Sequence, residues 1–466
     1  MLWACFGLPH LALDGVLRTR ADKGPLVLVD GPANARHIVA ANAAAREVGL
    51  HAGQRLTAAQ ALLAHFEMIP YDPAAVDRWQ RFLAGMAYRY SSQVALLPRA
   101  IVLEISRSQC LFGEWPVLES RLRSDLLALG FQHCLAAAPT PHAAYVLAGM
   151  RDGQAVLTQE TMRHALEAVP LSKSRLPEHA MDALPRMGIR RLGQLLRMPR
   201  DSLQRRFGAE LLQAMDRLLG RAPAELALYV PPDAVDWRIE LSHEVENIAA
   251  LVFPLKRMMG DLAAYLSGRD GGVQRFVLHL EHREGKATEV PVGMLSPERD
   301  AGVLFEAARG RLEQIRLPAP VMSLRLIADD LPGFTPAGRD LFDERPANAL
   351  PFEQLRERLR ARLGDHAVYR WSTTIDPRPE HSQCPSMQGN DYIEPHPRPT
   401  WLLERPMPLH GALRILAGPE RLETGWWDGD PMRRDYYLVE TSSGQRAWAF
   451  CAPDESSGWM LHGWFA

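Results

Sequence analysis

Residues 88–108 read YRYSSQVALLPRAIVLEISRS and contain the strand that says most about the fold. The run AIVLEIS (100–106) is short and apolar, which predicts a β-strand. Three more strands are predicted at LWACF (2–6), LVLVD (26–30) and CLAAAP (134–139). Amphipathic helical patterns lie between these strands, so residues 1–170 are expected to form a mixed α/β or α+β layer.

Two further modules follow this layer. Residues 171–232 lack a convincing strand pattern, and glycines separate their short helical segments, which predicts a small all-helical module. Residues 233–330 instead show strand, helix, strand, strand, helix and strand patterns, which is the ferredoxin-like split β-α-β-β-α-β motif. Alternation within VQRFVLHLEH (273–282) indicates a sheet with one face on helices and one face in water.

The last third of the chain has a different composition. Residues 331–372 are expected to be an exposed linker with a short Arg-rich helix, and residues 373–400, rich in Pro, His and polar residues, a flexible linker. Residues 401–466 hold six of the eleven tryptophans and several strand-like runs, which predicts a compact β module. The fold class predicted for the whole chain is therefore α+β multidomain.

Bulk composition excludes several classes of protein. No apolar run approaches the roughly 20 residues needed to span a bilayer, and the N-terminal stretch lacks the basic region of a signal peptide. We therefore expect a cytoplasmic protein without membrane contact. The five cysteines include no CxxC pair, so neither a zinc site nor a disulfide framework is predicted.

A cluster of arginines in the helical module is the strongest local charge signal. The net charge of the chain is −2, but between positions 186 and 206 seven arginines stand against one acid, Asp201. Such a patch could neutralise the phosphates of DNA, although a solvated helical face explains the charge equally well. The candidate DNA-binding residues are Arg186, Arg190, Arg191, Arg197, Arg200, Arg205 and Arg206.

Three stretches, in this order, resemble segments of Y-family DNA polymerases. NAAAREVGLHAGQRLTAAQAL (42–62) is similar to the fingers segment, and residues 88–108 are similar to the segment leading into the strand with the catalytic acids. MGIRRLGQLLRMP (187–199) resembles part of the thumb. The resemblance implies palm and fingers at 1–170, a thumb at 171–232 and a little finger at 233–330.

The chain departs from this family where catalysis needs carboxylates. Nucleotidyl transfer uses acids that hold two divalent cations roughly 4 Å apart. By the resemblance, Cys5 and Gly7 stand where the first strand carries acids, and Arg99 and Ala100 stand at the second acidic element. Arg99 would place a cation at the metal position and repel metal ions there. We therefore expect no metal site, no cofactor and no polymerase activity.

Triphosphate binding is altered as well. Arg46 matches the arginine of the fingers segment, but Ala43 replaces the tyrosine before it, and Pro139-Thr140-Pro141 replaces a Pro-Asn-Lys element. Arg46 is thus a candidate nucleotide-binding residue in a site that has lost its other members. A surface ion pair is the alternative role for Arg46.

The departures together resemble the ImuB subgroup, the polymerase-like members of bacterial ImuA–ImuB–DnaE-type mutagenesis cassettes. GPERLETGWWDGDPMRRDYYLVET (418–441) and WMLHGWFA (459–466) look like the tail of that subgroup. The resemblance implies a scaffold for translesion synthesis and the SOS response to DNA damage. Its implied partners are DNA, the sliding clamp, ImuA and an error-prone DnaE-type polymerase.

Two sets of residues are candidates for the protein contacts of such a scaffold. Leu341 and Phe342, in the predicted linker, could fill the apolar pocket of a clamp, although the glutamine that leads such peptides is absent. They could also pack on their own domain. The candidate partner-binding residues of the tail are Trp426, Trp427, Trp459 and Trp464, since Trp dominates interface hot spots, but a small β core would also use them.

Two alternatives to the scaffold remain open at this point. An active Y-family polymerase would need relocated metal ligands, and Asp14, Glu104 and Asp125 are the nearby acids that could serve. A pure protein–protein adaptor would have lost DNA binding altogether, and the salt dependence of DNA binding distinguishes it from the scaffold.

Overall fold

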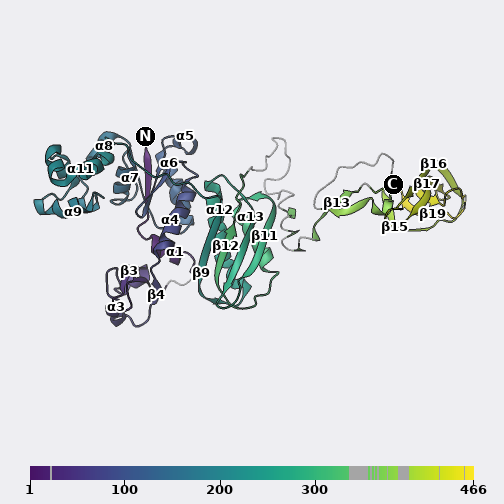
Figure 1. The fold of residues 1–466 in the computed structure, drawn as a ribbon, viewed down its shortest axis with the longest axis horizontal. Helices are drawn as coiled ribbons and strands as arrows, with labels where there is room; N and C mark the ends of the chain where they lie inside the picture. The colour runs from purple at the N-terminus through teal and green to yellow at the C-terminus, as the bar shows by residue number, and fades with distance from the viewer. Residues whose placement is uncertain are drawn as a thin grey trace. The chain divides into compact units, whose positions relative to one another are not determined.

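The computed structural model describes residues 1–20, 24–334, 355–356, 359–360, 363–364, 367–374, 376–386, 398–429, 431–455 and 457–465. The chain divides into two compact units, Met1–Arg362 and Leu363–Ala466 (Figure 1). The α+β multidomain fold class is confirmed: separate sheets and a helical module alternate along the first unit, and the second unit is built mainly of strands.

A five-stranded sheet forms the palm-like centre of the first unit. Its order is β5-β6-β1-β7-β8, and the apolar run of β6 pairs antiparallel with β1. Phe6, Ile101 and Leu103 point to one face, which α4 and α6 cover, while Cys5 and Val102 point to the other face, which α7 covers. The bounds are β1 (Trp3–Gly7), α1 (Leu11–Leu17), α4 (Pro73–Ala87), β5 (Val94–Leu97), β6 (Ala100–Glu104), α5 (Gln109–Phe112), α6 (Trp115–Ala128), β7 (Cys134–Ala138), α7 (Pro141–Ala148) and β8 (Gln154–Ala155).

A small fingers-like module is inserted between α1 and α4. Its three strands have the order β3-β2-β4, and a core of small apolar side chains holds two helices against them. The side chain of Asn42 accepts the backbone N–H of Ala45 at 2.8 Å and so caps α2. The bounds are β2 (Leu26–Asp30), β3 (His37–Ala41), α2 (Ala43–Glu47), α3 (Leu56–Leu62) and β4 (Glu67–Pro70).

The predicted thumb-like module is helical and shares its core with the α7 face of the palm sheet. In Figure 1, α9 and α11 lie beyond α7 from the palm strands. Gly188 and Gly208 have φ of 80° and 77°, and Gly208 kinks α11. The bounds are α8 (Gln159–Glu167), η1 (Leu171–Lys173), α9 (Glu178–Ala183), η2 (Pro185–Met187), α10 (Leu192–Leu196) and α11 (Arg200–Leu219).

The little-finger-like module has the predicted β-α-β-β-α-β order. Its sheet runs β11-β10-β12-β9, and Phe276, Leu278 and Leu280 are buried on one face, as the alternation predicted. On the other face Arg325 forms an ion pair with Asp236 at 2.6 Å, across neighbouring strands. The bounds are β9 (Val235–Val245), α12 (Ile248–Gly268), β10 (Val273–His282), β11 (Thr288–Glu298), α13 (Ala301–Leu312) and β12 (Val321–Ala328).

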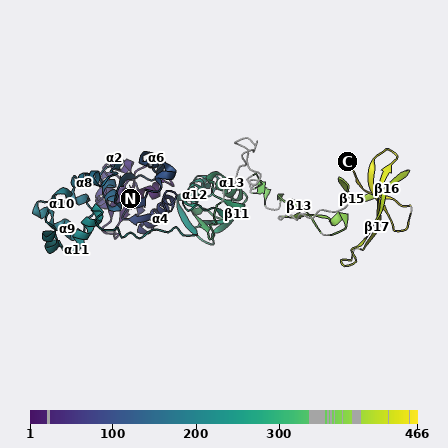
Figure 2. The same ribbon diagram turned by 90° about the horizontal axis from the view of Figure 1, so that it is seen from above.

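The second unit is an antiparallel sheet of order β15-β19-β18-β17-β16, three strands of which Figure 2 labels. Tyr436 stacks on Trp448 with ring centroids 4.1 Å apart, and its hydroxyl bonds to His462 at 2.7 Å. The bounds are β13 (Arg370–Thr373), η4 (Pro379–His381), β14 (Gln383–Ser386), β15 (Trp401–Pro408), β16 (Leu413–Thr424), β17 (Met432–Thr441), β18 (Arg446–Cys451) and β19 (Met460–Trp464).

Part of the stretch expected to be a flexible linker is folded. The short helix η4 and strand β14 lie within residues 373–400. Arg378 forms an ion pair with Asp428 at 2.5 Å, and Glu380 with Arg434 at 2.6 Å, so ion pairs hold η4 against the turn after β16 and against β17. Composition alone missed these contacts because their partners lie about 50 residues further along the chain.

Candidate nucleic-acid interface

The degenerate positions of the palm come together at one end of the sheet. Gly7 of β1 lies opposite Ala100 of β6, and Cys5 lies opposite Val102. Cys5 is fully buried, and burial raises the pKa of its thiol far above the usual range. The residues that replace acids by the resemblance thus form an apolar strand end with the exposed Arg99 beside it.

Arg99 lies in a tight turn that the palm holds in place. Pro98 and Arg99 connect β5 to β6, and Arg99 adopts a φ of 55°. Its carbonyl accepts the backbone N–H of Leu8 at 2.8 Å, and the carbonyl of Pro98 accepts the hydroxyl of Tyr145 at 2.8 Å. The backbone is therefore fixed while the guanidinium faces solvent.

Arg175 is a second cation at this site, and the sequence did not single it out. Its guanidinium lies 4.9 Å from the ring centroid of Tyr145, and its φ is 58°. Burial raises the pKa of Tyr145, and the charges of Arg175 and Arg99 oppose this rise. Arg175 thus adopts a backbone conformation that glycine favours, which the residue type alone does not reveal.

The acids named as replacement ligands do not converge on this end of the sheet. Glu104 lies opposite Trp3, at the other end of β6 from Ala100, and accepts the N–H of Ser106 at 2.9 Å. Asp14 accepts the N–H of Gln132 at 2.9 Å, and Asp125 accepts the hydroxyl of Tyr90 at 2.6 Å. Among the described residues, no group of three or more His, Cys, Asp and Glu side chains is placed to hold a metal.

The remaining nucleotide candidate, Arg46, lies on α2. Its Nε donates to the carbonyl of Asn42 in its own helix at 3.4 Å, and its guanidinium is exposed. Burial first, and the charge of Arg46 second, lower the pKa of His10. Arg46 is therefore near enough to His10, the residue before α1, for the two charges to interact.

The seven thumb arginines divide into two groups. Arg200 is neutralised by a bidentate ion pair with Asp216, with N–O distances of 2.7 and 2.6 Å. Arg197 forms an ion pair with Glu167 at 3.5 Å. The other five make no ion pair with any described residue; they lie in η2, between η2 and α10, or on the first half of α11. These free cations are Arg186, Arg190, Arg191, Arg205 and Arg206.

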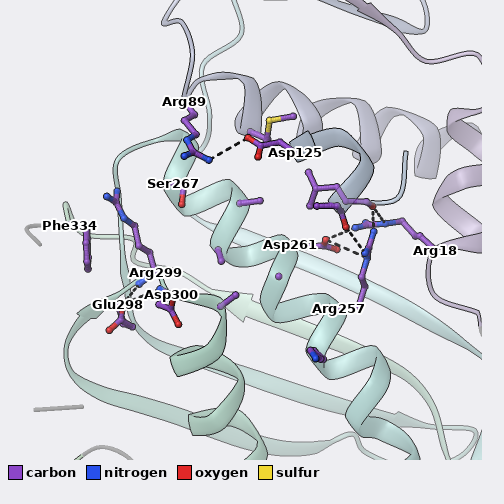
Figure 3. A pocket seen from close by; sticks show the side chains of 18 of the residues that line it. Arg18, Arg89, Asp125, Arg257, Asp261, Ser267, Glu298, Arg299, Asp300 and Phe334 are labelled. Atoms are coloured by element: carbon purple, nitrogen blue, oxygen red, sulfur yellow. Dashed lines mark hydrogen bonds and ion pairs between the residues drawn. The ribbon is translucent and has the colours of Figure 1, made fainter. Parts of the chain in front are cut away.

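A buried ion cluster fixes the little-finger module to the palm (Figure 3). Arg18, just after α1, forms an ion pair with Asp261 of α12 and donates to the carbonyl of Leu129 at 2.9 Å. Arg257 donates to the carbonyl of Ala128 at 2.9 Å. Burial raises the pKa of Asp261, and Arg18 opposes the rise. The two guanidiniums also donate hydrogen bonds to free carbonyls at the C-terminal end of α6, where the helix dipole favours cations.

The tryptophans proposed as candidates for partner binding occupy two different structural environments. Trp426 and Trp427 are 79% and 56% exposed in the turn after β16, with ring centroids 5.6 Å apart. Trp459 and Trp464 instead pack on the core of the second unit. The pair Leu341–Phe342 lies outside the described residues.

Known proteins with sequence similarity to this chain include a family of polymerase-like proteins and two full-length relatives. Residues 15–148 match the impB/mucB/samB family. Two relatives, each described as Protein ImuB, come from Caulobacter vibrioides strains NA1000 / CB15N and ATCC 19089 / CIP 103742 / CB 15. Each is 26% identical over 461 residues, covering 90% of this chain and 100% of the relative. The chain is similar to Protein ImuB. The ImuB resemblance expected from the sequence is thereby confirmed along nearly the whole chain.

Solved structures with similarity to the chain include DinB from Sulfolobus solfataricus, at 13% identity and a TM-score of 0.39. That alignment covers 72% of this chain and 100% of DinB. A Y-family DNA polymerase chimera of Dbh and Dpo4 gives 13% identity and a TM-score of 0.42, over 71% of this chain and 99% of the chimera. Separately, no helix in the described ranges is long and apolar enough to cross a membrane.

Proposed function

We propose that this ImuB-like protein is a non-catalytic, DNA-binding scaffold for translesion synthesis. The observation that carries the proposal is the pair of exposed arginines, Arg99 and Arg175, at the end of the palm sheet where polymerases of this family bind metal ions through acids. Cations at that position repel divalent metals and attract phosphates. The palm shape then serves to bind and present DNA.

A primer-extension assay with the purified full chain tests the loss of catalysis. We expect no template-directed incorporation with Mg²⁺ or Mn²⁺, because by the resemblance Cys5, Gly7, Arg99 and Ala100 stand where acids would hold both ions. A replicative polymerase added to the same reaction controls for a usable template. Incorporation that persists in the Arg99→Ala variant would refute the proposal and favour an active polymerase with relocated ligands.

DNA binding distinguishes the scaffold from a pure protein adaptor. The five unpaired thumb arginines predict affinity that falls steeply with salt, since each phosphate contact releases counterions. Replacing Arg205 and Arg206 by Gln should reduce the slope of log K against log salt by about 2. Arg200→Gln is the matched control, because Asp216 already neutralises Arg200. The adaptor is favoured if the full chain fails to bind DNA even at low salt.

The proposed protein partners are the sliding clamp, ImuA and an error-prone DnaE-type polymerase in the cytoplasm. We propose Leu341 and Phe342 as the clamp contact, and Trp426 with Trp427 as a hot spot for a cassette partner, since both rings are exposed. Pull-down with a Leu341→Ala/Phe342→Ala variant should lose the clamp alone. Trp426→Ala/Trp427→Ala should lose ImuA or the polymerase alone, with the half-buried Trp459 left unchanged in both variants.

A further inference from the structure

Tyr145 lies beside a cavity between palm and thumb; the guanidinium of Arg175 lies over its ring, and its hydroxyl bonds to the turn that contains Arg99. The cavity has a volume of about 320 Å³, and its lining includes Leu97, Tyr145 and Arg175. Arg99 lies in the adjoining turn, two residues after Leu97. We propose that Arg99 and Arg175 form a metal-free site for one backbone phosphate of DNA. This inference rests on the proposed DNA-binding function and locates one of its contacts.

The backbone at both arginines is held in a conformation that arginine rarely adopts. Among the described residues only four non-glycine positions have a positive φ, and two of them are Arg99 and Arg175. Such conformations persist where the surrounding structure enforces them, and they cluster at ligand sites. Here the bonds to Leu8 and Tyr145 hold the turn of Arg99, so the backbone from which its side chain extends is fixed before any ligand arrives.

The charge balance of the site favours an anion. Neither Arg99 nor Arg175 forms an ion pair with a described residue. The acid in the cavity lining, Glu210, lies 3.7 Å from His179, and Arg217 is paired with Glu225 at 2.8 Å. The two arginines are therefore the cations available to a ligand.

Guanidinium chemistry points to phosphate. Its planar fork binds two oxygens of one phosphate, and Arg175 is further oriented by the face of Tyr145. In catalytic polymerases two divalent cations stabilise the reacting oxygens of the phosphate, and the resemblance puts their acids at this end of the palm. A pair of arginines on a fixed backbone supplies similar positive charge without a metal, so DNA binding at this site should not need Mg²⁺.

The test measures duplex binding by fluorescence anisotropy in EDTA over a range of salt, with the full chain. The variants are Arg99→Gln, Arg175→Gln and the double variant, which keep a non-glycine residue at each positive φ. Because both arginines contact the same phosphate, the double change should lower the salt slope by about 0.9, and each single change should lower it by less than this. Arg99→Lys should keep the salt slope of the unsubstituted protein, because lysine carries the same charge. Arg81→Gln is the control, because Arg81 lies on α4 at the opposite face of the palm sheet.

The outcomes separate this site from the function it rests on. An unchanged slope in the double variant, with DNA still bound, overturns the site and leaves the scaffold intact. Loss of binding in EDTA also overturns the site, since a metal would then be required. No DNA binding by the unsubstituted protein overturns both proposals.

Two further measurements do not depend on the variants folding. Phenylglyoxal labels exposed arginines, and bound DNA should protect Arg99 and Arg175 of the unsubstituted protein from this reagent; undiminished labelling overturns the site. Titration with a deoxynucleoside triphosphate in EDTA should give no saturable binding. Saturable binding that disappears in the double variant would assign the arginines to a free nucleotide, against the backbone phosphate proposed here.

Discussion

Among single residues, Asp14 carries the clearest electrostatic signature. The side chain of this residue of α1 is buried, and burial raises its carboxyl pKa to about 6, while the N–H of Gln132 opposes the rise. The folded protein therefore binds a proton at Asp14 more tightly than the unfolded chain, in which the pKa is near 3.8. It follows that stability from this group is present below about pH 4 and is lost as the pH rises through about 6.

We predict that Asp14→Asn removes this pH dependence. Asn keeps an oxygen that can accept the N–H of Gln132 but carries no charge to bury. Above about pH 7 the variant should be more stable by about 2 kcal/mol, and the gain should vanish near pH 4. Urea unfolding at a series of pH values measures this. Parallel curves for the two proteins would contradict the prediction.

A second prediction concerns the buried carboxylate of Asp261. Asp261→Asn leaves the guanidiniums of Arg18 and Arg257 without their counter-charge, which should destabilise the first unit by about 3–5 kcal/mol. The control is Asp77→Asn, whose partner Arg81 lies at 2.7 Å in an exposed pair. That change should cost less than about 1 kcal/mol. Equal losses in the two variants would show that the buried cluster has no special role.

At the scale of elements, the packing of α12 against α4 depends on two glycines. A Cβ at Gly268 would lie 2.0 Å from the carbonyl oxygen of Gly85, and a Cβ at Gly85 would lie 2.5 Å from the ring of Tyr265. The two helices therefore approach more closely than any side chain would allow. A single hydrophobic core then runs from the palm strands through α12 into the little-finger sheet.

The third prediction is that Gly268→Ala disrupts this packing, whereas Gly260→Ala does not. The new methyl at position 268 meets backbone, which cannot move aside, so a loss of about 3 kcal/mol is expected. Position 260 lies in the same helix with no atom within 4 Å of a new Cβ. Alanine there should stabilise by about 0.5–1 kcal/mol through helix propensity. Thermal unfolding of both variants measures the contrast.

Elements were easier to predict than the contacts between them. The order of the little-finger motif and its buried alternation follow from period-2 patterns, which depend on near neighbours in the chain. The roles of Gly85 and Arg18 do not follow from such patterns. Gly85 contacts a residue about 180 positions away, and Arg18 contacts one about 240 positions away. Arg175 escaped notice for the same reason: its partner Tyr145 lies on a different element.

At the scale of the whole molecule, the chain consists of two units with separate cores. We predict two unfolding transitions in calorimetry of the full chain. Trp448→Ala removes the ring stacked on Tyr436 and should lower only the transition of the second unit. Asp261→Asn should lower only the other transition. A single transition that moves in both variants would show that the units unfold together.

The shared core of palm and little finger has a mechanical consequence. A body held together by a buried ion cluster and two touching glycines is stiff, whereas duplex DNA kinks readily at flexible steps. When DNA binds along both modules, the rigid protein does not adapt to it. The DNA must then bend to fit the protein, and the free energy of binding includes the cost of bending the DNA. We therefore expect tighter binding to duplexes that are already kinked or unstacked than to straight ones of the same length, which competition anisotropy can measure. Stiffness would then give the protein a preference for distorted DNA without any contact to a damaged base.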